Sequence, residues 1–398
     1  MAENAWLLLF PYLPISREVN LGRWKLIPVR EFAGTWRSAW FRQRSMTIIR
    51  RHVDRSGQPL SLPSILVDRE AGADGILPEP AEVEALQLAL GFGVIDSAPT
   101  WHSPAEMTLI AADVAARHGK DQAAILSELE EENDNARYGT WRVGTADNVE
   151  PFFWPVHRTG GIARQYGSII STTVAGGGRG LSGKVIPPNE LHLPGGLSLD
   201  GERVSALYSI FAEAPGNEEA LKLRECARWF LQAWRNTPSL LQAQRVVLLR
   251  TAYEVLLGDH GTTTSKEKLA RRLTERFEGL PTEERELIRP GDMLWQPGQP
   301  HDLHVPHVSK SLAPYSDLER WFIGLSTARN RIVHEGNLTL LEDAAVGSVY
   351  AGPYWRVASR VLRDVILVEA HRWGFAGLWD DTFGRAGRQV MAKLTSAE

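Results

Sequence analysis

The chain has 398 residues, of which 43% are hydrophobic and 23% charged, and its formal net charge is −4. This length exceeds that of one typical domain, so we expect two. The near-neutral charge excludes a protein that attracts nucleic acid through its overall charge, so any such contact must come from a local patch. The single cysteine, Cys226, excludes an internal disulfide and a cysteine-based zinc site. It also fits a cytoplasmic location.

The first part of the chain mixes predicted strands with predicted helices. Short runs rich in β-branched and aromatic residues predict strands in WLLLFPYL, WKLIPV, SMTIIRRHV and LPSILV. The first run follows Glu3 rather than basic residues, so we expect a strand and not a signal peptide, and no apolar run has the roughly 18 residues of a membrane span. Capping and helical spacing then predict helices over 80–90, 104–118 and 121–137.

Residues 138–205 return to tryptophan- and phenylalanine-rich strands and glycine-rich turns. We therefore predict one mixed α+β domain over residues 1–205, whose role its sequence does not indicate. From about residue 217 the spacing of apolar residues changes to the helical period. The predicted helices cover 218–236, 238–257, 265–278, 282–288, 317–335 and 353–373. Residues 206–398 are thus expected to form an all-α bundle that follows the α+β domain.

Two stretches imitate functional motifs. Residues 178–185, GRGLSGKV, have the spacing of a phosphate-binding P-loop, but Val185 stands where the Mg²⁺-binding Ser or Thr is needed and prolines follow. Residues 301–307, HDLHVPH, carry three histidines that suit zinc, but two prolines prevent a regular helix and no cysteine lies nearby. We favour a glycine loop and an exposed loop, respectively, and predict neither a metal nor another cofactor.

The stretch STARNRIVHEGN, residues 326–337, has features of a helix end. His334 and Arg331 suit the negative end of a helix, and Gly336 suits the position that closes it. A capping box formed by Ser316 and Glu319 marks the start of the same helix. Capping alone explains the histidine and the glycine of this stretch.

Capping does not explain Arg329 and Asn330, which lie one turn earlier. Histidine exchanges protons near neutral pH, and the planar fork of arginine binds phosphate oxygens. These residue types in one helix therefore also suit cleavage of a phosphodiester without a metal. We expect Ile332 and Val333, which lie between the polar residues, to anchor the helix to the core.

Residues 329–334, RNRIVH, resemble the R-x4–6-H motif of the HEPN superfamily, helical-bundle proteins many of which are ribonucleases. Asn330 matches the polar residue that often follows the arginine, and the glycine of HEG matches one common after the histidine. An upstream helix with Glu254 and a long closing helix over 353–373 fit as well. Among HEPN proteins the chain is most similar to the ApeA-like group of prokaryotic defence proteins, over residues 215–375.

The resemblance implies a metal-independent endoribonuclease with RNA as its substrate and no cofactor. The 2′-hydroxyl of RNA would attack the phosphate, so products would end in 2′,3′-cyclic phosphate and 5′-hydroxyl. His334 would transfer protons, and Arg329 would stabilise the phosphorane. Asn330 would orient the histidine or the phosphate, with Glu254 and Arg331 in supporting roles.

Arg329 and His334 are five residues apart, which separates them by roughly 140° around a helix. One histidine also cannot easily serve as base and acid on opposite sides of one phosphate. We therefore expect a homodimer with a composite active site, as the resemblance also implies. The chain would be a cytoplasmic anti-phage or toxin effector whose N-terminal domain senses a phage-derived trigger. The alternative is a catalytically inactive HEPN bundle that binds nucleic acid or protein.

Overall fold

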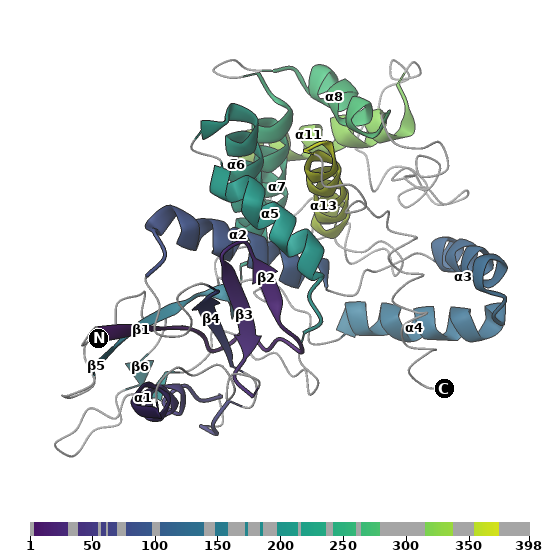
Figure 1. Ribbon diagram of the computed structural model, residues 1–398. Coiled ribbons are helices and arrows are strands. Elements are labelled where there is room, and N and C mark those ends of the chain that lie inside the picture. The colour runs from purple at the N-terminus through teal and green to yellow at the C-terminus, as the bar shows by residue number, and fades with distance from the viewer. Residues whose placement is uncertain are drawn as a thin grey trace. The chain divides into compact units, whose positions relative to one another are not determined.

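The computed structural model describes residues 4–30, 39–54, 57–60, 63–69, 77–97, 104–138, 148–157, 172–173, 184–185, 197–213, 216–235, 242–259, 264–278, 315–336 and 354–373. The chain divides into two compact units. The first combines Met1–Ser97 with Thr140–Asn217, and the second combines Ala98–Gly139 with Glu218–Glu398. The described strands belong to the first unit, and the described part of the second is helical (Figure 1). An α+β region followed by a mostly helical one confirms the predicted fold class.

Five antiparallel strands form the sheet of the first unit, in the order β2-β3-β4-β1-β5 (Figure 1). The strands are β1 (Asn4–Phe10), β2 (Val19–Leu21), β3 (Trp24–Pro28), β4 (Ser64–Asp68) and β5 (Phe152–His157). The register places Leu8 of β1 opposite Leu66 of β4 and Phe153 of β5. Leu7 to Phe10 are all buried, and successive strand residues point to opposite faces, so β1 is covered on both faces. The strand predicted for the first apolar run is confirmed.

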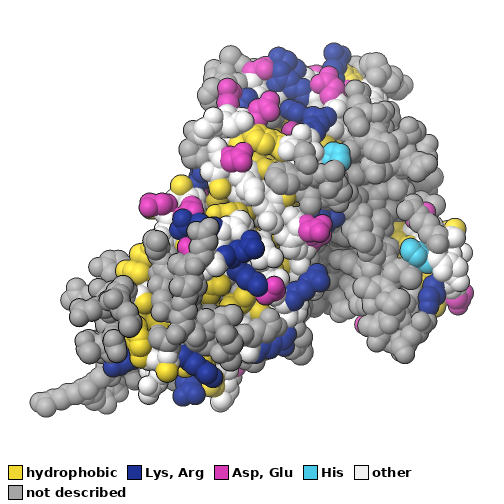
Figure 2. All heavy atoms as spheres, in the orientation of Figure 1, with side chains coloured by type: hydrophobic (Ala, Val, Ile, Leu, Met, Phe, Trp, Pro, Cys, Tyr) yellow, Lys and Arg dark blue, Asp and Glu magenta, His cyan; other side chains and the backbone are white. Residues whose placement is uncertain are grey.

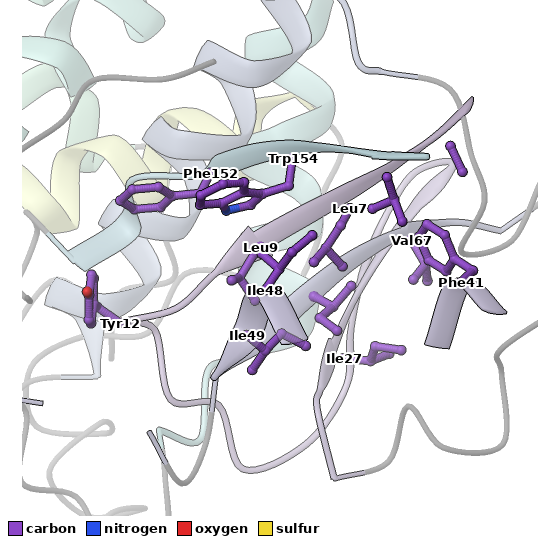
Figure 3. Packing of buried hydrophobic residues seen from close by; sticks show 13 residues of the cluster. Leu7, Leu9, Tyr12, Ile27, Phe41, Ile48, Ile49, Val67, Phe152 and Trp154 are labelled. Carbon is purple, nitrogen blue, oxygen red and sulfur yellow. The ribbon is translucent and has the colours of Figure 1, made fainter. Parts of the chain in front are cut away.

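Helix α1 (Ala39–Ile49) covers one face of this sheet (Figure 3). Its buried residues are Phe41, Ser45, Ile48 and Ile49, which recur at helical spacing. The strand predicted for SMTIIRRHV is therefore wrong, because most of that run belongs to α1. The β-branched residues favoured a strand, but packing of one helical side on the sheet outweighs that preference.

Helices α2 (Pro80–Asp96) and α5 (Gly201–Glu213) pack against each other in the same unit. Helix α2 was predicted to end before Gly91, but it runs through Gly91 and Gly93. A Cβ atom at Gly93 would lie 2.5 Å from Cγ2 of Val204 in α5. Glycine is thus used here for close helix packing and not as a helix end. Helix α5 begins in the region 138–205 that was predicted as strands and turns, and the predicted domain boundary at 205 falls within it.

His52 lies in the core of the first unit among aromatic rings. Its ring centroid is 4.9 Å from that of Phe152 and 6.0 Å from those of Tyr12 and Trp154, three residues labelled in Figure 3. The side chain is fully buried, and neither ring nitrogen has a hydrogen-bond partner among the described residues. Burial, with a smaller contribution from Arg51, lowers the pKa of His52 from 6.5 to about 3, so the imidazole is neutral at pH 7.

The helices of the second unit largely match their predicted ranges (Figure 1). They are α3 (Pro104–His118), α4 (Gln122–Tyr138), α6 (Glu218–Trp234), α7 (Gln242–Leu257), α8 (Lys266–Glu278), α11 (Asp317–Glu335) and α13 (Tyr354–Arg372). Helices α3 and α4 share a hydrophobic cluster of their own. Helix α7 contacts α6, α8, α11 and α13 and is the central element. The helix predicted over 282–288 lies outside the described residues.

Tyr253 shows how α7 holds its neighbours. The side chain is fully buried, and its hydroxyl donates to the carbonyl of Ala358 in α13 at 2.9 Å. Its ring centroid is 5.2 Å from that of Phe322 in α11, in an edge-to-face arrangement. One residue of α7 therefore fixes both α11 and α13. None of the helices in the described ranges has the length and hydrophobicity needed to cross a membrane.

Candidate active site

The candidate motif lies in the second half of α11, whose two ends are capped as predicted. At the start, the Ser316 hydroxyl accepts from the Glu319 amide at 3.2 Å, and the Glu319 carboxylate accepts from the Ser316 amide at 2.7 Å. At the end, Gly336 has a φ of 65°, which favours glycine. The helix is continuous to Glu335, so it does not loosen between Arg329 and His334.

Arg329 continues the buried side of α11. It follows Phe322 and Ser326, which are both buried, by two turns and one turn of the helix. Its side chain is half-buried, and Nη1 donates to Oδ1 of Asn330 at 3.1 Å. The structure thus brings Arg329 and Asn330 together, with the guanidinium at the edge of the helix packing surface.

His334 lies on the solvent side of α11, one turn after the exposed Asn330. Among the described residues, no hydrogen bond or ion pair holds its ring. Since the helix is regular here, Arg329 and His334 point in directions that differ by about 140°. A single chain therefore does not bring these two residues together. Gly336 closes the helix without a bond from the histidine side chain.

The two apolar residues between them behave differently. Ile332 is 8% exposed and Val333 is 47% exposed. The predicted anchoring role is confirmed for Ile332 and is wrong for Val333, which follows the buried Ser326 by two turns but is exposed in the last turn of α11. Val333 and His334 consequently form an exposed surface at the end of α11.

Glu254, predicted as a supporting residue, belongs to a polar network between α7 and α11. Arg250, one turn earlier in α7, is 3% exposed, and its Nη1 lies 3.2 Å from Oε1 of Glu254. Its Nε donates to the Ser326 hydroxyl at 2.7 Å, and that hydroxyl donates to the Phe322 carbonyl at 2.9 Å. The guanidinium also lies 4.9 Å from the centroid of the Phe322 ring, a cation–π contact. Arg250 is thereby held by an ion pair, a hydrogen bond and a cation–π contact, while its buried Nη1 makes no hydrogen bond among the described residues.

Burial lowers the pKa of Arg250, the carboxylate of Glu254 opposes that effect, and the charge of Arg329 adds to it. The two arginines are therefore close enough to repel each other. Sequence reasoning missed both Arg250 and Ser326. The spacing of Arg250 and Glu254, four residues apart in a predicted helix, was a signal for the ion pair. The contact with Ser326 joins two distant segments, and nothing local indicates it.

Further cations lie at the contact between α8 and α11. Lys266, at the start of α8, donates to the hydroxyl of Thr327 at 3.4 Å. Arg331 follows Thr327 by one turn, on the same side of α11. Within the described ranges, no carboxylate forms an ion pair with Lys266, Arg329 or Arg331. Three cations at this contact thus have no ion-pair partner in the described ranges, and Glu335 is the one acidic residue in the second half of α11.

A second charged region of this unit is a cavity of about 490 Å³. It is lined by residues of α6, α7, α8 and α13, including Glu218, Lys222, Arg272, Arg276, Glu369 and Arg372. The side chain of Glu369 is 12% exposed. Its Oε1 forms ion pairs with Nη1 of Arg276 at 3.1 Å and with Nη1 of Arg372 at 3.5 Å. Figure 2 shows Lys, Arg, Asp and Glu side chains intermingled on the surface where α8 lies. Each arginine of this cavity thus has a carboxylate partner: Arg276 and Arg372 share Glu369, and Arg272 pairs with Asp259.

The two stretches that resemble a P-loop and a zinc site, residues 178–185 and 301–307, lie largely outside the described residues. Of residues 178–185, only Lys184 and Val185 are described, and they form a strand, β7, paired with Thr172–Thr173, β6. The helix that a P-loop requires after its lysine does not begin there. Residues 301–307 are not among those described. In the part of the chain that is described, no group of three or more His, Cys, Asp or Glu side chains suits a metal ion.

No protein-family model, no curated protein and no solved structure matches this chain. The resemblance to HEPN proteins therefore rests on residues 329–334 and on the helices around them. The chemistry of the site has to be argued from the side chains themselves.

Proposed function

We propose that the helical region is a HEPN-type, metal-independent endoribonuclease of prokaryotic defence or toxin systems. The observation that carries the proposal is the set of three cations, Lys266, Arg329 and Arg331, which have no carboxylate partner in the described ranges and lie on, or in contact with, the helix that carries the exposed His334. An RNA strand would supply the missing anions through its phosphates. The binding-only alternative shares this surface, so cleavage has to be tested directly.

In this proposal, Arg329 binds the non-bridging oxygens of the scissile phosphate and stabilises the charge that develops on them. His334 removes the proton of the 2′-hydroxyl or protonates the leaving 5′-oxygen. Asn330, which accepts a hydrogen bond from Arg329, orients the guanidinium and shares an exposed side with His334. The nucleophile belongs to the substrate, so no step needs a metal or another cofactor.

The proposal includes a homodimer. Arg329 and His334 point in different directions within one chain, and two copies of α11 around a two-fold axis would place the histidine of one chain near the arginine of its partner. The exposed Val333 beside His334 gives this contact an apolar centre. The first unit would sense a phage-derived trigger and control access to the composite site.

The experiment is cleavage of a defined single-stranded RNA by the purified full chain. We expect 2′,3′-cyclic phosphate and 5′-hydroxyl ends, no effect of a chelator, and no cleavage of DNA or of RNA methylated at the scissile 2′-hydroxyl. Ends with 3′-hydroxyl and 5′-phosphate, or loss of activity with the chelator, would show a metal nuclease. Binding of RNA with no cleavage, in the presence of the trigger as well, would support the binding bundle.

A further inference from the structure

Two cations and one carboxylate meet between α7 and the candidate site. Arg250 and Glu254 lie on α7, and Arg329 lies one turn after Ser326 on α11. Arg250 holds the serine hydroxyl at 2.7 Å, which places its guanidinium at the turn of α11 that precedes Arg329. The Glu254 carboxylate pairs with Arg250, and the Arg250 guanidinium lies at the turn of α11 that leads to Arg329.

The two arginines differ in burial and therefore in how strongly each needs a counter-ion. Arg250 is 3% exposed, so its charge requires a counter-ion, and removal of that carboxylate would leave it buried and unpaired. Arg329 is half-buried, and it bonds only a neutral amide oxygen among the described residues. The stronger demand for the carboxylate thus comes from Arg250, which leaves Arg329 with its full positive charge.

We infer that Arg250 is a positioning residue that occupies the Glu254 carboxylate and so keeps the Arg329 guanidinium available to a phosphate group. This inference rests on the proposed function for the identity of the phosphate, but the charge arrangement stands without it. If Arg250 lost its charge, Glu254 would have a single cationic neighbour on α11, and Arg329 would turn toward it. The site would then be neutralised from within, as the arginines of the charged cavity are.

The test compares Arg250→Gln and Arg250→Lys with the double variant Arg250→Gln/Glu254→Gln. Glutamine keeps a donor for the Ser326 hydroxyl without the charge, and lysine keeps both. The first measurement is the rate at which phenylglyoxal labels Arg329, followed by mass spectrometry, with the exposed Arg271 of α8 as the internal reference. Melting temperatures confirm that each variant is folded.

Relative to Arg271, we expect labelling of Arg329 to fall about five-fold in Arg250→Gln, since a surface ion pair of roughly 1 kcal/mol protects by that order. It should stay at the wild-type rate in Arg250→Lys and return to that rate in the double variant. A purely structural role for Arg250 predicts a different result, in which the double variant, having lost both partners, is not restored. Unchanged labelling in Arg250→Gln would also overturn the inference.

Cleavage of the defined RNA is the second measurement. We expect Arg250→Gln to lower kcat/KM about ten-fold, mainly through KM, and the double variant to recover most of that loss. If the wild-type chain does not cleave RNA, the proposed function fails while the labelling result still decides the role of Arg250. If RNA is cleaved but labelling does not change, the proposed function stands and the role of Arg250 is refuted.

Discussion

The candidate site on α11 and the charged cavity use the same residue types but partner them differently. In the cavity, Arg276 and Arg372 share the carboxylate of Glu369, and Arg272 pairs with Asp259 at 2.5 Å. At the candidate site, the carboxylate of Glu254 pairs with a buried arginine, and no carboxylate in the described ranges pairs with Arg329 or Arg331.

The difference separates a region that stabilises the fold from one that can bind a ligand. A cation that already has its counter-ion must break that pair to bind an external anion, whereas an unpaired cation loses only its own hydration. The cavity has a volume of about 490 Å³, yet its arginines already have carboxylate partners. Under the proposed function, cavity volume alone would therefore point to a region other than the candidate site.

The largest predicted effect is a loss of RNA cleavage when the candidate site is changed. We expect Arg329→Ala and His334→Ala each to lower RNA cleavage by about 10² or more, the usual scale for removal of a group that stabilises the transition state or transfers a proton. The matched control is Arg276→Ala in the cavity, which should cleave RNA at the wild-type rate. Measurement of kcat/KM and of the melting temperature for all three variants tests it. Wild-type cleavage by His334→Ala would mean that α11 ends in a structural cap only.

A second change tests the apolar surface beside His334. Val333→Glu places a charge at the centre of the proposed two-fold contact, so we expect a shift from about twice the 44.3 kDa chain mass to the monomer, with cleavage reduced roughly ten-fold. Leu221→Glu is the control, because Leu221 on α6 is 44% exposed, close to the 47% of Val333. Sedimentation at micromolar concentration measures the mass. Equal behaviour of the two variants would contradict the assigned interface.

Substitutions at the cavity should change the stability of the chain and not its RNA cleavage. Glu369→Ala leaves Arg276 and Arg372 without their shared carboxylate, so we expect the free energy of unfolding to fall by about 1–3 kcal/mol, a range that allows for the partial exposure of the arginines. The control is Glu218→Ala, which removes an exposed partner of Lys222 at the same cavity and should cost less than about 0.5 kcal/mol. Urea unfolding measures both, and similar losses would argue against the ion pairs of Glu369.

The smallest expected effect per step concerns the first unit, where each pH unit changes stability slightly. The pKa of His52 is about 3 in the folded chain, against an ordinary value of 6.5 for a solvated histidine, so the unfolded chain binds the extra proton between these values. Stability is therefore retained above pH 6.5 and falls on acidification toward pH 3, by up to about 1.4 kcal/mol per pH unit from this group. In His52→Phe the slope should be shallower by that amount. Urea unfolding from pH 7 to 4 provides the test, and parallel curves would refute it.

The sequence predicted those features that depend on neighbouring residues. Ser316 and Glu319 form the predicted capping box, and Gly336 closes the helix that carries Arg329 and His334. These interactions lie within one or two turns of the chain, so spacing is enough to find them. The strand in the first apolar run was predictable for a similar reason, since a short apolar run bounded by prolines suits a buried strand.

Features that depend on distant segments were not predictable in this way. The run SMTIIRRHV contributes to a helix because one side of it packs on a sheet, and α2 continues through Gly91 to Gly93, which packs against Val204 of α5. Arg250 contacts the candidate site through Ser326, a residue 76 positions later in the chain. Propensity and spacing carry no information about such partners.

Gly93 shows what close packing implies for the variation that this chain can tolerate. Even the smallest other side chain would bring a methyl group within 2.5 Å of Cγ2 of Val204. Real carbon atoms do not approach so closely, and both helices are held by their burial in the same core. In a library of random variants selected only for a folded chain, position 93 should thus keep glycine unless position 204 becomes smaller at the same time. The two positions would then vary as a pair, although 111 residues separate them in the sequence.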